Sequence, residues 1–217
     1  AWVVQRARKS YLLSDKKLFV VDEYVETDKL FFPRKKYQYI TTQLLQSKKK
    51  IILTVAPYSD DRKGGKYFLE LARRLLQHNE YQFIYVGMNV NDVNIPDNCI
   101  SIGYISDQKE LAEYYSIADV FVCTSLADTM PNVCLDALSS GTPVIGFNNT
   151  GIPYTADKPY GVFVENENVN ELCNAVLCVE KKDDELISSC RKYALTRYSP
   201  EIYYNKMITI YNTMKSL

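Results

Sequence analysis

The sequence predicts an α/β fold in which a parallel sheet is covered by helices on both faces. Short, continuously apolar runs rich in Val, Ile and Phe recur along the chain, and segments with helical periodicity separate most of them. Strands that are apolar along their whole length are buried on both sides, which is typical of parallel sheets. We expect strands at 51–56, 82–87, 99–103, 119–124 and 142–147, and helices at 66–78, 107–117 and 131–140.

Two of these helices carry specific signals. The helix at 66–78 has one apolar face with i, i+3, i+4, i+7, i+8 spacing, made by Phe68, Leu71, Ala72, Leu75 and Leu76. For the helix at 107–117, Asp107 suits the N-cap and Glu110 follows three residues later, as in a capping box.

Beyond residue 165 the chain becomes helical, with periodicity over 168–179, 183–198 and 199–214. Ser199 and Pro200 fit the N-cap and first position of the last helix. This helix carries an apolar face made by Tyr203, Met207, Ile210, Tyr211 and Met214. Two explanations fit: the face packs on this domain, or part of it packs on a domain that the chain lacks.

The N-terminal 50 residues are less regular. Trp2 to Leu13 is typical of a basic helix, Leu18 to Val21 of a short strand, and Tyr24 to Pro33 of a loop. The chain begins with Ala1 rather than Met, on a helical pattern already under way, so we expect a fragment of a longer protein.

Length and composition indicate one ordered domain. The 217 residues suit a single α/β domain, and 47% hydrophobic residues argue against disorder. Because 26 basic residues balance 26 acidic ones, a nucleic-acid partner is not expected. No apolar run approaches the roughly 20 residues that span a bilayer, and no signal peptide is visible.

The cysteines and the single histidine suggest structural positions. The six cysteines contain no C-x-x-C pair, which favours reduced, buried thiols over disulfides or zinc ligands. His78 follows a predicted helix and suits a cation at its C-terminal turn. Catalytic triads that depend on histidine are therefore excluded.

A polar loop, P-Y-S-D-D-R-K-G-G at 57–65, follows the first strand and opens a helix. Arg62 and Lys63 offer cations for a phosphate, and Gly64 allows close approach of the backbone. The loop is not a Walker A motif, and the chain has no G-x-G-x-x-G. A polar turn that requires glycine explains the loop equally well.

Two acids, Asp128 and Asp136, flank the start of the helix expected near Pro131. A helix N-terminus at the carboxyl end of a parallel strand binds phosphates, here through the amides of Asn132 and Val133. The acids could then hold the hydroxyls of a sugar or ribose. Alternatively, Asp128 is a cap-region residue and Asp136 a solvated helical acid.

Taken in order, these segments resemble a known family. The motifs are R-K-G-G at 62–65, I-G-Y-I at 102–105, A-D-V-F-V-C-T-S at 118–125, D-x7-D at 128–136, A-L-S-S-G-T-P-V-I-G at 137–146, T-G-I-P at 150–153 and Y-G-V-F-V at 160–164. The set resembles the C-terminal, donor-binding domain of the GT-B fold, family 4 retaining glycosyltransferases (glycosyl transferases group 1). The resemblance implies a Rossmann-like domain at 34–198, preceded by a linker or crossover region at 1–33 and followed by a C-terminal helix at 199–217.

The resemblance assigns roles residue by residue. Lys63 matches the lysine that binds the donor diphosphate, Asp128 the first acid of E-x7-E near the donor sugar, and Asp136 the second acid, which holds the ribose. At Ile105 the backbone would meet the base. The predicted donor-binding set is Arg62, Lys63, Gly64, Ile105, Asp128, Met130, Asn132, Val133 and Asp136, with Asp128 and Lys63 as predicted catalytic residues.

The sequence departs from the family pattern at three places. Both acids are Asp instead of Glu, which shortens the reach of each carboxylate by a methylene group. Ala56 and Pro57 stand where the family has Gly-Arg, so Arg62 is expected to replace the usual phosphate arginine. Tyr154 stands in place of an acid.

The resemblance implies transfer of a sugar from a nucleotide-diphospho donor, such as a UDP- or GDP-sugar, with retained configuration and no metal cofactor. The acceptor, a sugar or lipid-linked molecule, would bind the missing N-terminal domain, so this fragment alone is expected to be inactive. We expect a cytoplasmic protein of polysaccharide or glycolipid biosynthesis, with contact of the full-length protein to the inner membrane surface.

Two other functions fit the same fold. A nucleotide-sugar epimerase would draw on several histidines and acids, and His78 lies outside the loops. A non-catalytic nucleotide-binding or interaction module is consistent with the two Glu-to-Asp changes. Titration of UDP, GDP and ADP distinguishes these hypotheses.

Overall fold

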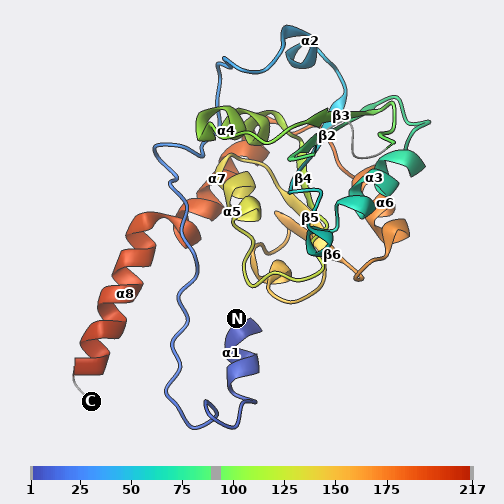
Figure 1. Cartoon of the computed structure of the whole chain (residues 1–217). Coiled ribbons are helices and arrows are strands. Elements are labelled where there is room, and N and C mark those ends of the chain that lie inside the picture. Colours follow the sequence, from blue (N-terminus) through green and yellow to red (C-terminus); the bar gives the residue numbers. More distant parts are fainter. Residues whose placement is uncertain (1, 89–93, 216–217) are drawn as a thin grey trace.

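A computed structural model describes residues 2–88 and 94–215 and shows one six-stranded parallel sheet (Figure 1). The strands are β1 (Lys50–Val55), β2 (Tyr81–Val86), β3 (Cys99–Ile102), β4 (Val120–Cys123), β5 (Val144–Phe147) and β6 (Gly161–Val164). Their order is β3-β2-β1-β4-β5-β6, and all neighbours are parallel. The α/β fold class is confirmed, and the five expected strands lie within two residues of their predicted bounds.

The strand order creates a switch point between the two central strands. The chain runs outward from β1 through β2 to β3, then returns to β4 on the other side of β1, where Ile52 pairs with Val120. β4 is buried along its whole length, as its continuous apolar run predicts. Ligands of doubly wound sheets bind beyond the carboxyl ends of the strands at such a switch point.

Helices cover both faces of the sheet (Figure 1). On one side, α3 (Gly65–Arg74) and α6 (Val169–Leu177) share an apolar cluster that includes Phe68 and Leu172. The other face is covered by α4 (Gln108–Ile117), α5 (Asn132–Ser139) and α7 (Asp184–Tyr198). Tyr115, Leu135 and Ala194 belong to the cluster on that side.

The predicted N-cap of one helix is confirmed, and the predicted C-terminal end of another is corrected. Asp107 caps α4 by accepting a hydrogen bond of 2.8 Å from the Lys109 amide. The helix predicted at 66–78 ends at Arg74, because Leu75 leaves helical geometry and the chain turns toward β2. Leu76 therefore leaves the apolar face and is 37% exposed.

The N-terminal predictions need larger corrections. α1 (Trp2–Ala7) is shorter than the predicted helix, and the segment predicted as a strand at 18–21 is extended but unpaired with the sheet. That segment lies beside α8 (Pro200–Lys215), where Asp22 pairs with Lys206 at 3.0 Å. A helix uses its backbone N–H and C=O groups in its own hydrogen bonds, so it leaves none to pair with a strand. A short helix, α2 (Thr42–Leu45), was not predicted.

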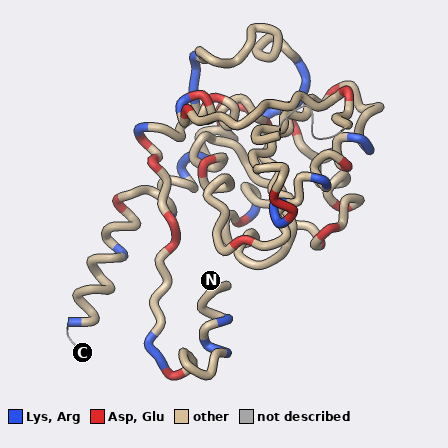
Figure 2. The backbone as a smooth tube through the Cα atoms, viewed as in Figure 1, with Lys and Arg blue, Asp and Glu red and all other residues tan. Residues whose placement is uncertain are grey.

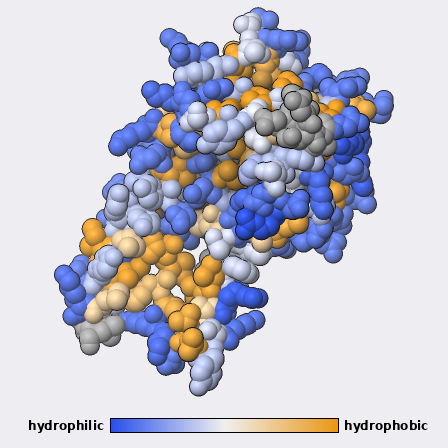
Figure 3. Space-filling model, viewed as in Figure 1, coloured by the Kyte–Doolittle hydropathy of each residue, from blue (hydrophilic) through white to orange (hydrophobic). Residues whose placement is uncertain are grey.

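α8 begins as predicted, with Ser199 accepting a hydrogen bond from the Ile202 amide at 3.4 Å. It has no buried residue, although Tyr203, Met207 and Ile210 are half-buried. The other members of the predicted face, Tyr211 and Met214, are 58% and 55% exposed. Figure 3 shows an apolar surface over this helix and the adjacent N-terminal segment. The face thus packs only partly on this chain.

Residues 27–39, which lie between the N-terminal segment and the sheet, are hydrogen-bonded to α4 and α7. The buried Glu113 carboxylate accepts hydrogen bonds from the amides of Gln38 and Tyr39 at 2.8–2.9 Å. Arg191 donates to the carbonyl oxygens of Thr27 and Phe31 at 2.7 and 2.8 Å. Buried charges need partners of this kind, so residues 27–39 form part of the domain.

Acidic and basic residues mix along the chain, and five of the six cysteines are buried, as predicted. Figure 2 shows Lys and Arg interspersed with Asp and Glu along the chain. All six cysteines are free, but Cys178 is exposed because it lies at the C-cap of α6, whereas the other five are buried. Within the described ranges, none of the helices has the length and apolar character needed to cross a bilayer.

Candidate functional site

The loops after β1 and β4 are locked together by backbone contacts. The 57–65 loop forms a 3-10 turn, η1 (Asp61–Lys63), and the Arg62 carbonyl accepts a hydrogen bond of 2.7 Å from Leu126. Gly64 has φ of +66°, and a Cβ there would lie 2.0 Å from the Thr124 carbonyl oxygen. The glycine is required by contact with the protein's own backbone as well as by its left-handed conformation.

Lys63 and Asp128 meet across this junction. The Lys63 Nζ lies 2.8 Å from the Asp128 Oδ2, and their side chains are 33% and 15% exposed. The other oxygen, Asp128 Oδ1, accepts a hydrogen bond of 3.3 Å from the Met130 amide. Partial burial makes this pair stronger than an ion pair on an open surface.

This pair lies in a pocket of about 300 Å³, lined by Trp2, Arg62, Lys63, Ala127, Asp128, Thr129 and Thr150. Lys63 and Val133 also line a smaller cavity of about 70 Å³ between the ends of β1 and β4. Sequence reasoning did not place Trp2 or Thr150 here. Thr150 belongs to the T-G-I-P motif, whereas no pattern around Trp2 points to this pocket.

Arg62 lies at the rim of the same pocket with its guanidinium already bound. Its Nε and Nη2 donate to the two carboxylate oxygens of Asp60 at 3.0 and 2.9 Å, and its side chain is 79% exposed. The hydrogen bonds from Arg62 lower the pKa of Asp60 and raise that of Arg62. A phosphate at Arg62 must therefore compete with Asp60.

The N-terminus of α5 lies next to the pair, as the sequence predicts. Pro131 is the N-cap and contributes no side-chain cap. In the described part of the chain, the amides of Asn132 and Val133 have no hydrogen-bond acceptor. Free first-turn amides and the helix dipole attract anions.

Asp136 lies deeper on the same helix and is half-buried. Burial raises the pKa of its carboxyl to about 8. Across the residues that the structure describes, its side chain has no hydrogen-bond partner. Burial raises the pKa of Tyr115, and the nearby Asp136 adds a smaller contribution in the same direction. Asp136 is thus not a solvated helical acid, and its oxygens remain available to a ligand.

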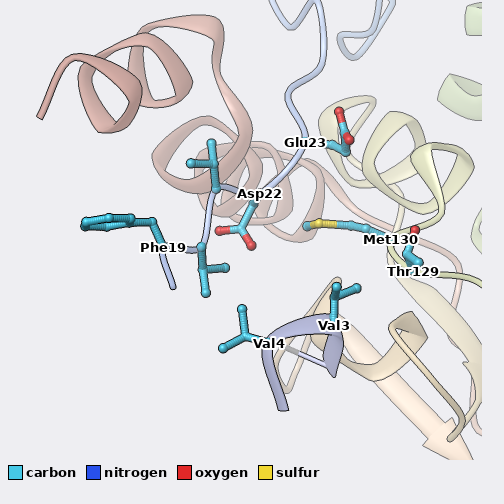
Figure 4. A pocket seen from close by; sticks show the side chains of 9 residues that line it. Val3, Val4, Phe19, Asp22, Glu23, Thr129 and Met130 are labelled. Carbon is cyan, nitrogen blue, oxygen red and sulfur yellow. The ribbon is translucent and has the colours of Figure 1, made fainter. Parts of the chain in front are cut away.

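Of the nine predicted donor-binding residues, Arg62, Lys63 and Asp128 line this pocket, Val133 lines the smaller cavity, and Gly64, Asn132 and Asp136 line neither. The side chains of Ile105 and Met130 lie elsewhere. The Ile105 side chain is buried in the apolar core, 8% exposed. The Met130 side chain lines a neighbouring pocket of about 240 Å³ between α1 and the segment at 19–23, where Figure 4 shows it pointing toward Asp22. Only the backbone amide of Met130 reaches Asp128.

The structure shows no cluster of metal ligands among residues 2–88 and 94–215, where no three His, Cys, Asp or Glu side chains are placed to hold an ion. The charged groups at the pocket are instead the Lys63 ammonium, paired with Asp128, and the Arg62 guanidinium, paired with Asp60. Together with the free α5 amides, they suit a ligand that combines phosphates with hydroxyls.

The sheet, its switch point and this pocket define an α/β protein with an anion-attracting site at the carboxyl edge of the sheet. The family described as "Glycosyl transferases group 1" matches residues 37–197. The chain belongs to this family.

Curated relatives are similar over part of their length. The chain is 27% identical over 177 residues to an "Uncharacterized 41.2 kDa protein in cps region" of Klebsiella pneumoniae, covering 76% of this chain and 47% of that protein. It is 28% identical over 146 residues to the alpha-monoglucosyldiacylglycerol synthase of Streptococcus pneumoniae, covering 61% of this chain and 32% of the synthase. The chain thus spans about half of these relatives or less.

Solved structures share the fold. Sucrose-phosphate synthase from Thermosynechococcus elongatus superposes with a TM-score of 0.77 at 21% identity, over 98% of this chain and 56% of the synthase. TarM of S. aureus, in a complex that contains UDP, gives a TM-score of 0.68 at 19% identity, over 93% of this chain and 41% of TarM.

Proposed function

We propose that this chain is the donor-binding half of a retaining glycosyltransferase that uses a nucleotide-diphospho sugar. The observation that carries the proposal is the convergence of the Lys63 ammonium, the Asp128 carboxylate and the free α5 amides at one edge of the sheet. Membership of the group 1 family supports it, and a neighbour of the same fold has been solved with UDP.

The main energetic demand of the reaction is the negative charge that develops on the leaving diphosphate. Lys63 and the amides of Asn132 and Val133 stabilise that charge, in the manner of an oxyanion hole. Arg62 adds a second cation once its guanidinium exchanges Asp60 for phosphate. Because cations and amides supply this stabilisation, the proposal needs no metal ion.

The two acids bind different parts of the donor. Asp128, at the mouth of the pocket, orients the donor sugar, and Asp136 accepts hydrogen bonds from the ribose hydroxyls. The half-buried Asp136 carboxyl has no hydrogen-bond partner among the described residues, and a ribose diol would supply donors to it, which supports this role. Two hydroxyl donors also favour the ionised carboxylate, so a bound nucleotide lowers the pKa of Asp136.

The acceptor, a sugar or a lipid-linked molecule, binds a part of the full protein outside this chain, which spans 47% of its Klebsiella relative. We therefore expect nucleotide binding without turnover by these 217 residues. The streptococcal glycolipid synthase and the capsule-region relative favour glycolipid or polysaccharide synthesis. Cytoplasmic location and contact with the inner membrane surface remain predictions.

Calorimetric titration with UDP, GDP and ADP tests the site directly. We expect one of them to bind the unchanged chain, and Lys63→Ala to weaken that binding about tenfold or more, because a charge-assisted contact to the diphosphate is lost. Lys66→Ala is the matched control: Lys66 is exposed three residues away and lies over the Tyr67 ring. Its affinity should stay within about twofold.

Binding that is insensitive to Lys63→Ala would contradict the assignment of the diphosphate to this pocket. If none of the three nucleotides binds, the donor site is refuted and an interaction module without nucleotide chemistry is favoured. Sugar transfer by the isolated chain would contradict the assignment of the acceptor to another part of the protein.

A further inference from the structure

Thr150 has a backbone conformation that its side chain disfavours. It lies in the loop after β5 with φ of +46°, in the left-handed region. For a β-branched residue this conformation is an outlier, and glycine would adopt it without strain. A strained residue that persists at the edge of a pocket indicates that its side chain contributes something there.

The Thr150 hydroxyl holds the backbone of Asp128 on both sides. Its Oγ1 accepts a hydrogen bond of 2.9 Å from the Asp128 amide and donates one of 2.8 Å to the Asp128 carbonyl. The Asn149 Oδ1, at 3.1 Å, is a more distant acceptor for the same proton. One side chain thus satisfies both backbone groups of a residue 22 positions earlier in the chain.

The neighbouring glycine completes this contact. The Gly151 amide donates to the same Asp128 carbonyl at 2.7 Å. A Cβ at Gly151 would lie 1.6 Å from the Thr129 carbonyl oxygen, so the loop at 150–151 packs directly against the loop at 128–129. These contacts fix where the Asp128 carboxylate projects, and that carboxylate holds Lys63 at 2.8 Å.

We propose that Thr150 is a positioning residue of the donor site: its hydroxyl fixes the Asp128 backbone, and Asp128 in turn holds the Lys63 ammonium where the diphosphate binds. The proposal rests on the donor-binding function proposed above. Thr150 also lines the 300 Å³ pocket, so the loop that it stabilises forms part of the pocket wall.

The alternative explanation is that the turn needs only a residue in the left-handed conformation, and it leads to a different prediction. Glycine would then serve better than threonine, and loss of the hydroxyl would leave nucleotide affinity unchanged. Two substitutions at Thr150 separate these cases, because both remove the β-branch and only one of them removes the hydroxyl. Thr150→Gly removes both, and Thr150→Ser keeps the hydroxyl while removing the β-branch.

The experiment titrates UDP, GDP and ADP into the unchanged chain, Thr150→Gly and Thr150→Ser. For the nucleotide that binds, we expect Thr150→Gly to weaken affinity about fivefold to tenfold, as loss of two positioning hydrogen bonds implies. Thr150→Ser should stay within about twofold. The thermal midpoint of Thr150→Gly should stay within about 3 °C of the unchanged chain, since relief of strain offsets the lost bonds.

Amide hydrogen exchange supplies a readout that needs no ligand. The Asp128 amide should exchange faster in Thr150→Gly than in the unchanged chain, and Thr150→Ser should restore its protection. Equal affinity of all three chains for a nucleotide would overturn the role of Thr150 and leave the donor site intact. Failure of the unchanged chain to bind any of the three would refute the donor site, and this inference with it.

Discussion

The two aspartates of the D-x7-D motif lie in contrasting surroundings. Asp128 is in a loop, where its carboxylate pairs with Lys63 and its backbone is held by Thr150 and Gly151. Asp136 lies on α5, half-buried and without a side-chain hydrogen bond in the described part of the protein. Asp128 is thus engaged by groups of the protein itself, whereas the described residues provide no such partner for the Asp136 side chain.

Asp128 is positioned by contacts within the protein, whereas we propose that Asp136 recognises a ligand. The Asp128 region depends on close backbone packing and an ion pair, so its geometry should be sensitive to steric change. The position of Asp136 is set by a helix, and its chemistry depends on burial, so it should be sensitive to pH.

The largest effect is expected from Gly151→Ala. The new Cβ would collide with the Thr129 carbonyl at 1.6 Å, and this contact is backbone rather than a flexible side chain. We expect a loss of about 3 kcal/mol in the free energy of unfolding, together with loss of nucleotide binding as the Asp128 loop moves. Chemical denaturation and calorimetric titration measure the two effects.

Gly146→Ala is the matched control within β5. Its Cβ would meet the Cys123 carbonyl oxygen at 3.0 Å, a tight contact that a small shift relieves. We expect a smaller loss of stability and retained nucleotide binding. Equal losses for the two variants would show that the 150–151 loop has no special part in holding Asp128.

An intermediate effect is expected from Asp136→Asn, and it should depend on pH. Because burial raises the folded pKa of Asp136 to about 8, well above the unfolded value near 4, the folded chain retains a proton that the unfolded chain releases. Retention of this proton stabilises the folded chain at low pH, and that stabilisation is lost as pH rises from about 4 to about 8. Asparagine does not titrate, so the variant avoids the loss.

Denaturation of both chains at several pH values measures this difference. Relative to Asp136→Asn, the unchanged chain should lose about 2 kcal/mol across that window, less than the full shift implies because the side chain is only half-buried. Asp97→Asn removes an exposed acid and keeps Asp136, so as the control it should lose stability across that window as the unchanged chain does. If the stability of Asp136→Asn fell with pH in parallel with that of the unchanged chain, the burial of this carboxyl would be contradicted.

The smallest effect is expected from Arg62→Ala. The guanidinium is 79% exposed and already bound by Asp60, so its removal should leave the thermal midpoint within about 1 °C. Nucleotide affinity should fall about threefold, less than for Lys63→Ala, because phosphate must displace Asp60. A loss for Arg62→Ala that exceeds the loss for Lys63→Ala would make Arg62 the principal phosphate ligand.

The sequence predicted the sheet and the position of α5 because both depend on local patterns. The apolar runs at 51–56 and 119–124 are long enough to identify buried strands, and the residues around Pro131 mark a helix start. The ordered motifs then placed Lys63 and Asp128 in one site, and the structure brings these two side chains into contact.

What the sequence did not predict depends on tertiary contacts. The segment at 18–21 has strand composition, yet it lies beside α8 instead of a sheet edge. The bond between Thr150 and Asp128 joins residues 22 positions apart, and nothing in the T-G-I-P motif shows that the threonine hydroxyl points back. Trp2 reaches the pocket only because α1 folds toward the loops after β1 and β4.

The way in which α8 and the N-terminal segment leave the domain has a mechanical consequence. Val25 and Tyr198 are joined by a backbone hydrogen bond of 2.9 Å at the point where both segments depart (Figure 1). Beyond it they are linked side by side through Asp22 and Lys206 and through the rings of Tyr24 and Tyr203, 5.0 Å apart. Because the two segments are linked along their length, we expect them to move as one body. A displacement of α8 should therefore also displace Phe19 to Asp22, which line the pocket that contains Met130.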